Sequence, residues 1–457
     1  MASFVSGYVR GGGSCSCVPR RKHARSPSST STSRRRNGAR ALLAKQQQEE
    51  VLVPVANGTE EMEAVIIADV LRRAGVQVCV ASIEDSKLVK CSRMVELVAD
   101  ELMEDVVSRK FAAIALPGGM PGSERLRDSE VLSGALETHT GLLSAICAAP
   151  AVVLEDRGLC DGRKATCHPA FQGQLNNLSS DRVAIDGKLI TSQGPGTAFE
   201  FSLALVSHLL GEDKASEVAA PMVLPPAVGC QSHKKEEEEQ LRCLGEAKLF
   251  EAAKKEKNAC PKVLVPIANG TEEMEAVIIV DVLRRAGMEV TVASVENDLE
   301  VIAARNVCLR ANTLIQDCVG LKFDAILLPG GMPGAENLAA SSLLIELLSS
   351  QEKSGELYGA ICASPAVVFE PNELLRDKCA TCHPAFMQGL STASEARVVL
   401  HDNCITSRGP GTAFEFALCV ICILLGPQKM KEVAGPMVLP STLSLADIAK
   451  KLSFSPC

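Results

Sequence analysis

Two cysteines in matching contexts are the residues of this chain best suited to chemistry. Cys147 lies in Ala-Ile-Cys-Ala-Ala-Pro, and Cys362, 215 residues later, lies in Ala-Ile-Cys-Ala-Ser-Pro. An apolar strand pattern precedes each cysteine, and small residues with a proline that suits a first helical turn follow it. A helix N-terminus lowers the pKa of a thiol and favours the nucleophilic thiolate. The alternative, a small buried hydrophobe at a strand end, is less consistent with retention in two copies.

Two glutamates are candidates to exchange a proton with these thiols. Glu63 and Glu275 are the third acids of two Glu-Glu-Met-Glu runs, each one helical turn before an isoleucine. On such an apolar helix face a carboxyl tends to keep its proton or share it with a thiolate. The local pattern alone favours the alternative, a third acid that compensates the helix dipole.

One histidine in each context completes the candidate set. His168 and His383 each follow their cysteine by 21 residues and are the only histidines that correspond between the copies. A proline comes next, so the segment is a loop or extended. A catalytic role and a structural role near a turn both remain open.

Metal and haem chemistry are not expected at these residues. Cys379-Ala-Thr-Cys-His383 matches the haem attachment pattern, but the first copy has Lys164 at the first cysteine position. A zinc site lacks clustered partners in the sequence. We therefore expect no cofactor and no metal.

The chain is an internal duplication. Residues 51–75 and 263–287 differ at only two positions, and Leu-Pro-Gly-Gly-Met-Pro-Gly occurs at 116–122 and at 328–334. Each unit has the size of an ordinary single domain. We expect domains at 49–226 and 262–440.

Alternating strands and helices must position the candidate residues. In the first copy we expect strands near 51–56, 76–82 and 111–116, and a helix that Thr59 caps and Gly75 closes. This alternation predicts an α/β fold with a mostly parallel sheet and helices on both faces. Functional groups collect at the carboxyl ends of such strands. The Pro117-Gly118-Gly119 turn ends one of them and can bring backbone N–H groups close to a reacting oxygen.

Composition narrows the classes of function. The formal net charge is -8, and residues 1–48 hold ten Lys or Arg and no acid, so the remainder is strongly acidic. A nucleic-acid partner is therefore disfavoured, and no apolar run is long enough for a membrane span. The Ser- and Arg-rich segment 1–48 reads as a transit peptide, with chloroplast as first choice and cytoplasm or nucleus as alternatives. Residues 227–261 read as a charged linker and 441–457 as a C-terminal tail. The odd count of 19 cysteines, most of them without a counterpart, favours reduced thiols over a disulfide framework.

Four repeated runs resemble the DJ-one family of the ThiJ/PfpI superfamily. They are Asn-Gly-Thr-Glu-Glu-Met-Glu-Ala-Val, Leu-Pro-Gly-Gly-Met-Pro-Gly, Ala-Ile-Cys-Ala and Gly-Pro-Gly-Thr-Ala-Phe-Glu-Phe. The resemblance covers about 51–225 and 263–440, and the tandem form behind a transit-like leader is similar to the plant members.

This resemblance implies two tandem flavodoxin-like domains, of the class I glutamine amidotransferase-like type, and an activity. The cysteines would be nucleophiles and the glutamates their proton-sharing partners. The histidines would line the pocket. The N–H pairs of Gly119 with Ala148, and of Gly331 with Ala363, would bind an oxyanion. Family members act as glutathione-independent glyoxalases and are described as deglycases, so we expect small aldehyde substrates such as methylglyoxal and glyoxal. An intramolecular pseudo-dimer or a homo-oligomer is expected from the same source.

Two other classes of function remain. A redox sensor or holdase would use the same thiol, oxidised to sulfinic acid beside its glutamate. A cysteine peptidase or amidotransferase would need a histidine with an acid partner downstream of the nucleophile, and the sequence does not support one. Two departures between the copies bear on whether both sites act: Gln193 corresponds to Arg408, and Cys91, which resembles a peripheral oxidisable cysteine of the family, corresponds to Ala303.

Overall fold

The computed structural model describes residues 50–225, 260–441 and 443. The predicted transit peptide lies outside these residues, as do nearly all of the predicted linker and of the C-terminal tail. Within the described part, the fold divides into two repeats that match the two copies in the sequence.

Each repeat is built on a seven-stranded sheet. The strand order is β5-β2-β1-β6-β7-β9-β8 in the first repeat and β14-β11-β10-β15-β16-β18-β17 in the second. All neighbours are parallel except the last pair of each sheet, β8 with β9 and β17 with β18. The predicted α/β class with a mostly parallel sheet is confirmed. The strands are β1 Glu50–Val55, β2 Gln77–Ser82, β3 Leu88–Lys90, β4 Glu96–Val98, β5 Glu101–Leu102, β6 Ala113–Leu116, β7 Leu142–Ile146, β8 Val183–Asp186, β9 Leu189–Ser192, β10 Lys262–Ile267, β11 Glu289–Ser294, β12 Glu300–Ile302, β13 Cys308–Arg310, β14 Thr313–Leu314, β15 Ala325–Leu328, β16 Leu357–Ile361, β17 Val398–His401 and β18 Cys404–Ser407.

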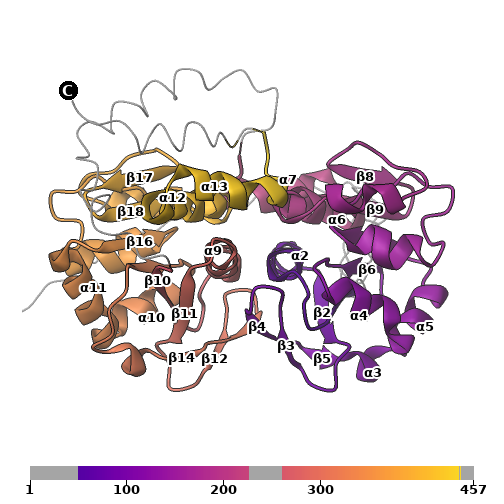
Figure 1. Cartoon of the computed structure of the whole chain (residues 1–457), viewed down its shortest axis with the longest axis horizontal. Helices are drawn as coiled ribbons and strands as arrows, with labels where there is room; N and C mark the ends of the chain where they lie inside the picture. Colours follow the sequence, from indigo (N-terminus) through magenta and orange to yellow (C-terminus); the bar gives the residue numbers. More distant parts are fainter. Residues whose placement is uncertain (1–49, 226–259, 442, 444–457) are drawn as a thin grey trace, which may run out of the picture. The chain divides into compact units, whose positions relative to one another are not determined.

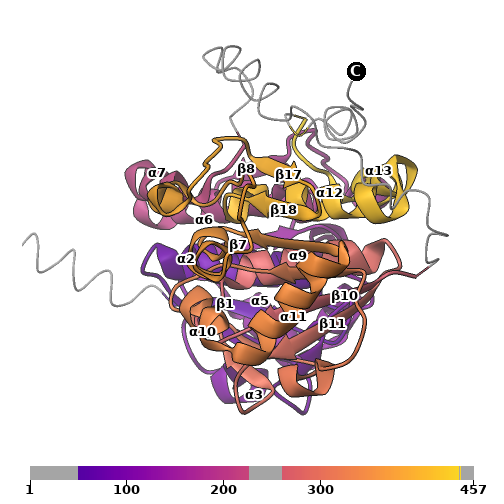
Figure 2. The ribbon, with the colours of Figure 1, turned by 90° about the vertical axis from the view of Figure 1, so that its left-hand side faces the viewer.

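Helices cover both faces of each sheet. In the first repeat α2 and α6 pack on one face, while α3, α4 and α5 cover the other (Figure 1). In the second repeat α10 and α11 lie across the outer face of the sheet (Figure 2). The α-helices are α2 Glu61–Arg73, α3 Met103–Val106, α4 Gly122–Asp128, α5 Glu130–Thr138, α6 Ala198–Leu210, α7 Glu212–Ala219, α9 Glu273–Arg285, α10 Gly334–Ala340, α11 Ser342–Ser354, α12 Ala413–Leu425 and α13 Pro427–Ala434.

The two repeats share a hydrophobic core. One cluster of buried residues contains apolar side chains of α2 and α6 together with those of α9 and α12, and the outer face of each sheet has a cluster of its own. A small sheet in the order β12-β13-β4-β3 also crosses between the repeats, with Leu97 opposite Leu309. The repeats therefore pack against each other as an intramolecular pseudo-dimer, one of the two arrangements expected.

The helix that opens each repeat differs in one detail from the prediction. Gly75 ends α2 with a φ of +84°, as predicted, and its N–H donates to the carbonyl of Arg72. Thr59 does not cap the helix; its hydroxyl accepts the N–H of Ala56 at 2.9 Å and closes the turn before it. Glu60 is the residue before the first turn, and its side chain makes no capping bond.

None of the helices in the described ranges is both long and apolar enough to cross a membrane.

Candidate active site

Three loops at the carboxyl ends of β1, β6 and β7 bring the predicted residues of the first repeat together. The Gly118 N–H donates to Oε2 of Glu63 at 2.7 Å, and the Glu60 N–H donates to the Gly118 carbonyl at 2.9 Å. A Cβ on Gly118 would lie 2.6 Å from Cβ of Cys147. Glu63, the double-glycine turn and Cys147 therefore form one compact site. Of the two readings of Glu63, this contact favours the one that places the carboxyl beside the thiol.

Gly119 can be only glycine at its position. Its φ is +92°, and a Cβ there would lie 2.3 Å from the Glu60 nitrogen. In this conformation the Gly119 N–H is directed at the Cys147 sulfur. An amide beside the sulfur is suitably placed to stabilise negative charge on an atom bonded to it. Ala148, the other predicted donor, is buried in the turn that follows Cys147.

Cys147 itself has a strained backbone. Its φ is +65°, a left-handed conformation that costs a non-glycine residue about 1–3 kcal/mol. Its N–H donates to the Ser192 carbonyl at 3.0 Å, and its carbonyl accepts the His168 N–H at 2.8 Å. The residue as a whole is half-buried. The backbone therefore holds the thiol at the carboxyl end of β7.

The Glu63 carboxyl and the Cys147 thiol compete for a proton. Burial and the neighbouring Glu60 carboxylate raise the pKa of Glu63 well above its ordinary value. Burial also raises the pKa of the Cys147 thiol, Glu63 and Glu60 raise it further, and the Gly119 N–H lowers it. Because each side chain shifts the pKa of the other, they titrate as a pair, and a proton on Glu63 removes the charge that opposes the thiolate.

The helix dipole is not the dominant influence on the thiol, contrary to the sequence-based expectation. The helix after Cys147 is a short π-helical segment, Pro150–Glu155. Burial has the largest effect on the pKa of the thiol, and it raises that pKa. The Glu63 proton, rather than the helix, is the feature that can favour ionised sulfur here.

His168 is held by backbone groups at both ring nitrogens. Nδ1 accepts the Ala170 N–H at 3.2 Å, so Nε2 carries the ring hydrogen and donates to the Pro436 carbonyl of the second repeat at 2.8 Å. Of the two roles left open, this arrangement favours positioning over proton transfer. It also leaves the ring unable to serve as the base of a hydrolytic triad.

The second repeat reproduces this geometry. The Gly330 N–H donates to Oε2 of Glu275 at 2.7 Å, and a Cβ on Gly330 would lie 2.5 Å from Cβ of Cys362. Cys362 has a φ of +64°, and Gly331 has a φ of +94°. His383 donates from Nε2 to the Pro221 carbonyl and accepts the Ala385 N–H at Nδ1. Ala363 is buried directly after Cys362. Both predicted sets of residues therefore come together.

An arginine of the opposite repeat lies beside each site, which sequence reasoning did not predict. Arg285 forms an ion pair with Glu60, and Arg73 forms one with Glu272. The positive charge of Arg285 lowers the pKa of Glu63, so it opposes the effect of Glu60. In the sequence these arginines are ordinary last-turn cations of α2 and α9, and no local signal indicates that they cross to the other repeat.

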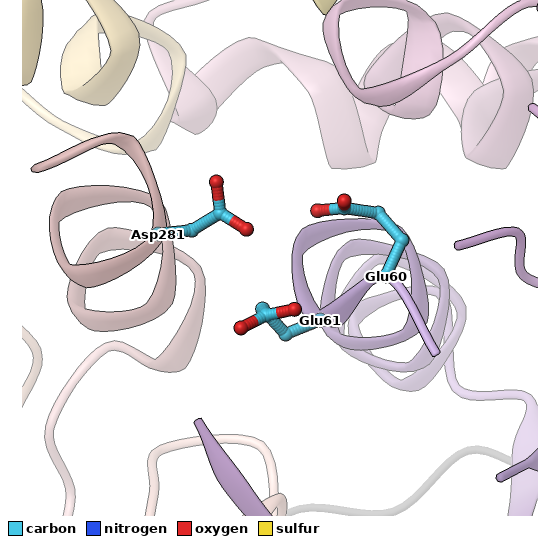
Figure 3. A group of neighbouring side chains, drawn as sticks. All are labelled: Glu60, Glu61 and Asp281. Atoms are coloured by element: carbon cyan, nitrogen blue, oxygen red, sulfur yellow. The ribbon is translucent and has the colours of Figure 1, made fainter. Parts of the chain in front are cut away.

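Buried carboxyl groups gather between α2 and α9. Glu60, Glu61 and Asp281 have carboxylate oxygens within 4.8 Å of one another, and Figure 3 shows the three side chains converging from the two helices. Asp69, Glu272 and Glu273 form the matching group. Arg285 bridges Glu60 and Asp281, which leaves an excess of acid in the first group. Burial raises the pKa of Glu61 to about 7 and that of Asp69 to about 8. Because Arg285 already lies between Glu60 and Asp281, the first group is better suited to retaining protons than to binding a cation.

Cys91, which the resemblance compares with a peripheral cysteine of the family, is buried. Its side chain is only 2% exposed, and burial followed by the Glu61 carboxylate raises the pKa of its thiol. A buried thiol with a raised pKa is less readily ionised, so oxidation of Cys91 stays a prediction from the resemblance.

Comparisons with known proteins show the family of the chain. The model of the DJ-1/PfpI family matches residues 49–208 and 261–422. Protein DJ-1 homolog B of Arabidopsis thaliana is 45% identical over 389 residues, which cover 83% of this chain and 86% of that protein. Protein DJ-1 homolog A of the same plant is 42% identical over 393 residues, 84% of this chain and 97% of that protein. The protein named Glutathione-independent glyoxalase DJR-1.2 of Caenorhabditis elegans is 35% identical over 181 residues, 38% of this chain and 95% of that protein. Because the family model matches both repeats and both plant relatives align with most of the chain, the protein belongs to the DJ-1/PfpI family, with one family domain in each repeat.

Proposed function

We propose that the protein converts small dicarbonyls such as methylglyoxal and glyoxal to 2-hydroxy acids without glutathione, at one site in each repeat. The observation that carries this proposal is the Cys147 thiol held against both the Glu63 carboxyl and the Gly119 N–H. These are a nucleophile, a proton carrier and an oxyanion donor. Resemblance to a relative named a glutathione-independent glyoxalase supports the same substrate class.

The proposed reaction is an internal redox exchange within the substrate. The thiolate adds to the aldehyde carbon and forms a hemithioacetal, whose oxyanion accepts a hydrogen bond from Gly119 and then a proton. Glu63, which has given its own proton to that oxygen, then takes the proton from the carbon and delivers it to the neighbouring carbonyl carbon. The hydroxyl proton passes to the oxygen of that carbonyl, which yields a thioester of the 2-hydroxy acid. Water then cleaves the thioester and restores the thiol. The same addition step would serve deglycation of early glycation adducts.

The test is D-lactate formation from methylglyoxal in the absence of glutathione. We expect turnover by the wild type and partial loss in each of Cys147→Ser and Cys362→Ser. Because Gln193 and Arg408 differ beside the two histidine loops, the two single variants need not lose equal shares. A wild type that yields no lactate would contradict the proposal.

The second candidate function is a redox sensor. The Gly119 N–H and the protonated Glu63 could donate hydrogen bonds to the oxygens of an oxidised Cys147 as readily as to a substrate oxyanion. Stoichiometric oxidation of Cys147 and Cys362 by peroxide, in a protein without turnover, would favour this function over the enzyme.

We further propose that residues 1–48 direct the protein to the chloroplast. The basis is the basic, acid-free composition of this segment. A reporter fused behind these residues should enter chloroplasts, and a reporter that stays in the cytosol or enters the nucleus would contradict the proposal.

A further inference from the structure

A strained turn ends each repeat. Val223 and Val438 both have a φ of +55°. A β-branched side chain rarely adopts the left-handed region, and such strain persists only where the surrounding structure enforces it. We call residues 221–224 the first-repeat turn and residues 436–439 the second-repeat turn. Their contacts indicate what the strain maintains.

The second-repeat turn packs against the first repeat rather than its own site. Arg182 donates from Nη1 to the carbonyls of Val438 at 3.1 Å and Leu439 at 3.3 Å. A Cβ on Gly196 would lie 2.6 Å from the Val438 carbonyl oxygen, so the two backbones touch. The same turn therefore lies against the Gly-Pro-Gly loop of the opposite repeat.

This contact continues to the reactive cysteine through one histidine. The Pro436 carbonyl accepts the Nε2 hydrogen of His168, and the His168 N–H donates to the Cys147 carbonyl. The Cys147 N–H donates to the Ser192 carbonyl, so the peptide groups on both sides of the Cys147 side chain are held by hydrogen bonds. Two short hydrogen bonds thus connect the second-repeat turn with the backbone that holds the Cys147 sulfur.

The first-repeat turn makes the reciprocal contacts. Arg397 donates to the carbonyls of Val223 and Leu224, and His383 donates to the Pro221 carbonyl. The His383 N–H in turn donates to the Cys362 carbonyl at 2.8 Å. The exchange between the repeats is therefore symmetric.

We propose that each strained turn positions the reactive cysteine of the opposite repeat: the second-repeat turn serves Cys147, and the first-repeat turn serves Cys362. Val438 and Val223 are positioning residues that act through His168 and His383. The two sites of one chain therefore depend on each other, and neither repeat holds a complete site alone. The expected effect on turnover rests on the proposed function. The expected effect on the position of the cysteine does not.

The test compares two chains that each keep one reactive cysteine, Cys362→Ser and Cys147→Ser. Into each chain we introduce Val438→Pro, which cannot adopt a positive φ, and separately the matched variant Val223→Pro. The first measurement is the rate of alkylation of the remaining reactive cysteine by iodoacetamide, followed by peptide mass. The second is kcat and KM for methylglyoxal.

A crossed pattern is expected. Val438→Pro should slow alkylation of Cys147 about tenfold or more, as expected for a displaced reacting group, and leave Cys362 within about twofold. Val223→Pro should do the reverse. kcat should fall at the affected site while KM changes little, because the cysteine is displaced and the pocket remains. Because Cys362 belongs to the same repeat as Val438, its unchanged rate shows that this repeat is folded.

Other patterns overturn the inference. Slowing confined to the cysteine of the same repeat, equal slowing of both cysteines in a folded chain, or no slowing would each do so. If Val438→Pro loses the circular dichroism signal of its parent chain, the test is made with Val438→Ala instead. This substitution removes only the two methyl groups of Val438, one of which lies near Gly194. A change confined to Cys147 then supports the inference, and any other result overturns it. Alkylation measures the position of the cysteine even if methylglyoxal is not turned over, so failure of the proposed function would be seen separately.

Discussion

At the residue scale, the proposed exchange of a proton between Glu63 and Cys147 is what would distinguish a reactive thiol from a buried one. The carboxyl is fully buried and has a raised pKa, so it is able to hold the proton that the thiol releases. The Gly118 N–H donates to Oε2 of this carboxyl and fixes its orientation. Removing the carboxyl without changing its shape should separate proton transfer from nucleophilicity.

We expect Glu63→Gln to lower kcat at the Cys147 site about 100-fold or more, because the amide cannot take up and return a proton. Alkylation of Cys147 should continue, since Gln preserves the shape of the site and a neutral hydrogen-bonding partner. The measurement uses the Cys362→Ser chain, with methylglyoxal turnover and iodoacetamide alkylation followed in parallel. Glu104→Gln, at an exposed position, is the control. Full turnover in Glu63→Gln would show that this carboxyl does not transfer the proton.

A second prediction at this scale concerns the double-glycine turn. Gly119 and Gly75 have similar positive φ values, +92° and +84°, but a Cβ meets the Glu60 nitrogen at 2.3 Å in the first case and nothing within 4 Å in the second. Gly75→Ala should therefore lower the free energy of unfolding by about 1 kcal/mol and leave activity intact.

Gly119→Ala should cost more stability than Gly75→Ala and abolish turnover at the Cys147 site, because the turn must move away from the sulfur. Urea unfolding and activity in the Cys362→Ser chain measure both effects. Equal effects of the two alanines would show that the close approach at Gly119 is unimportant.

At the scale of elements, α2 and α9 face each other with more buried acids than arginines to pair with them. The pKa of Glu61 is about 7 and that of Asp69 about 8 in the folded protein, against ordinary values of 4.5 and 3.8. At a pH between the ordinary and the raised pKa values, the folded state binds more protons than the unfolded state. The contribution of Glu61 and Asp69 to the free energy of unfolding is therefore largest below about pH 4, and it is lost as the pH rises through 7 to 8.

Glu61→Gln should flatten this dependence. We expect the urea midpoint of the wild type to fall between about pH 5 and 8, and the midpoint of the variant to fall less, because one titrating group is removed. The slope for one fully shifted group is at most about 1.4 kcal/mol per pH unit. Glu104→Gln, which is exposed, should leave the slope unchanged. A wild-type midpoint that rises with pH over this range would contradict the assignment of raised pKa values to the helix pair.

The sequence predicted the elements with strong local patterns and missed those that depend on the opposite repeat. The strand at Glu50–Val55, the helix ended by Gly75 and the parallel sheet follow from apolar runs, glycine stops and regular alternation. The three-residue strands β3 and β4 are too short to show a periodicity. The Arg285–Glu60 pair and the Pro436–His168 bond join residues more than 200 positions apart, and nothing local marks them.

At the scale of the whole molecule, the shared core predicts that the repeats unfold together. Leu71 on α2 is fully buried in the cluster that also contains the α9 side chains. Leu71→Ala should cost about 2–5 kcal/mol and leave a single unfolding transition at lower urea. Hydrogen exchange should rise in α9 as well as in α2, because both helices line the same core.

Leu321→Ala is the control for this prediction, since Leu321 is 57% exposed. This substitution should change neither the unfolding transition nor the rate of hydrogen exchange. Two separate transitions, with only the first repeat affected by Leu71→Ala, would show that the repeats are independent domains.

The most direct test of the account is the double variant Cys147→Ser/Cys362→Ser, assayed for D-lactate formation from methylglyoxal without glutathione. Both thiols are placed against their glutamates and their glycine amides in the same way, so the account predicts that the double variant is inactive while keeping the unfolding midpoint of the wild type. Lactate formation at the wild-type rate by the folded double variant would contradict it.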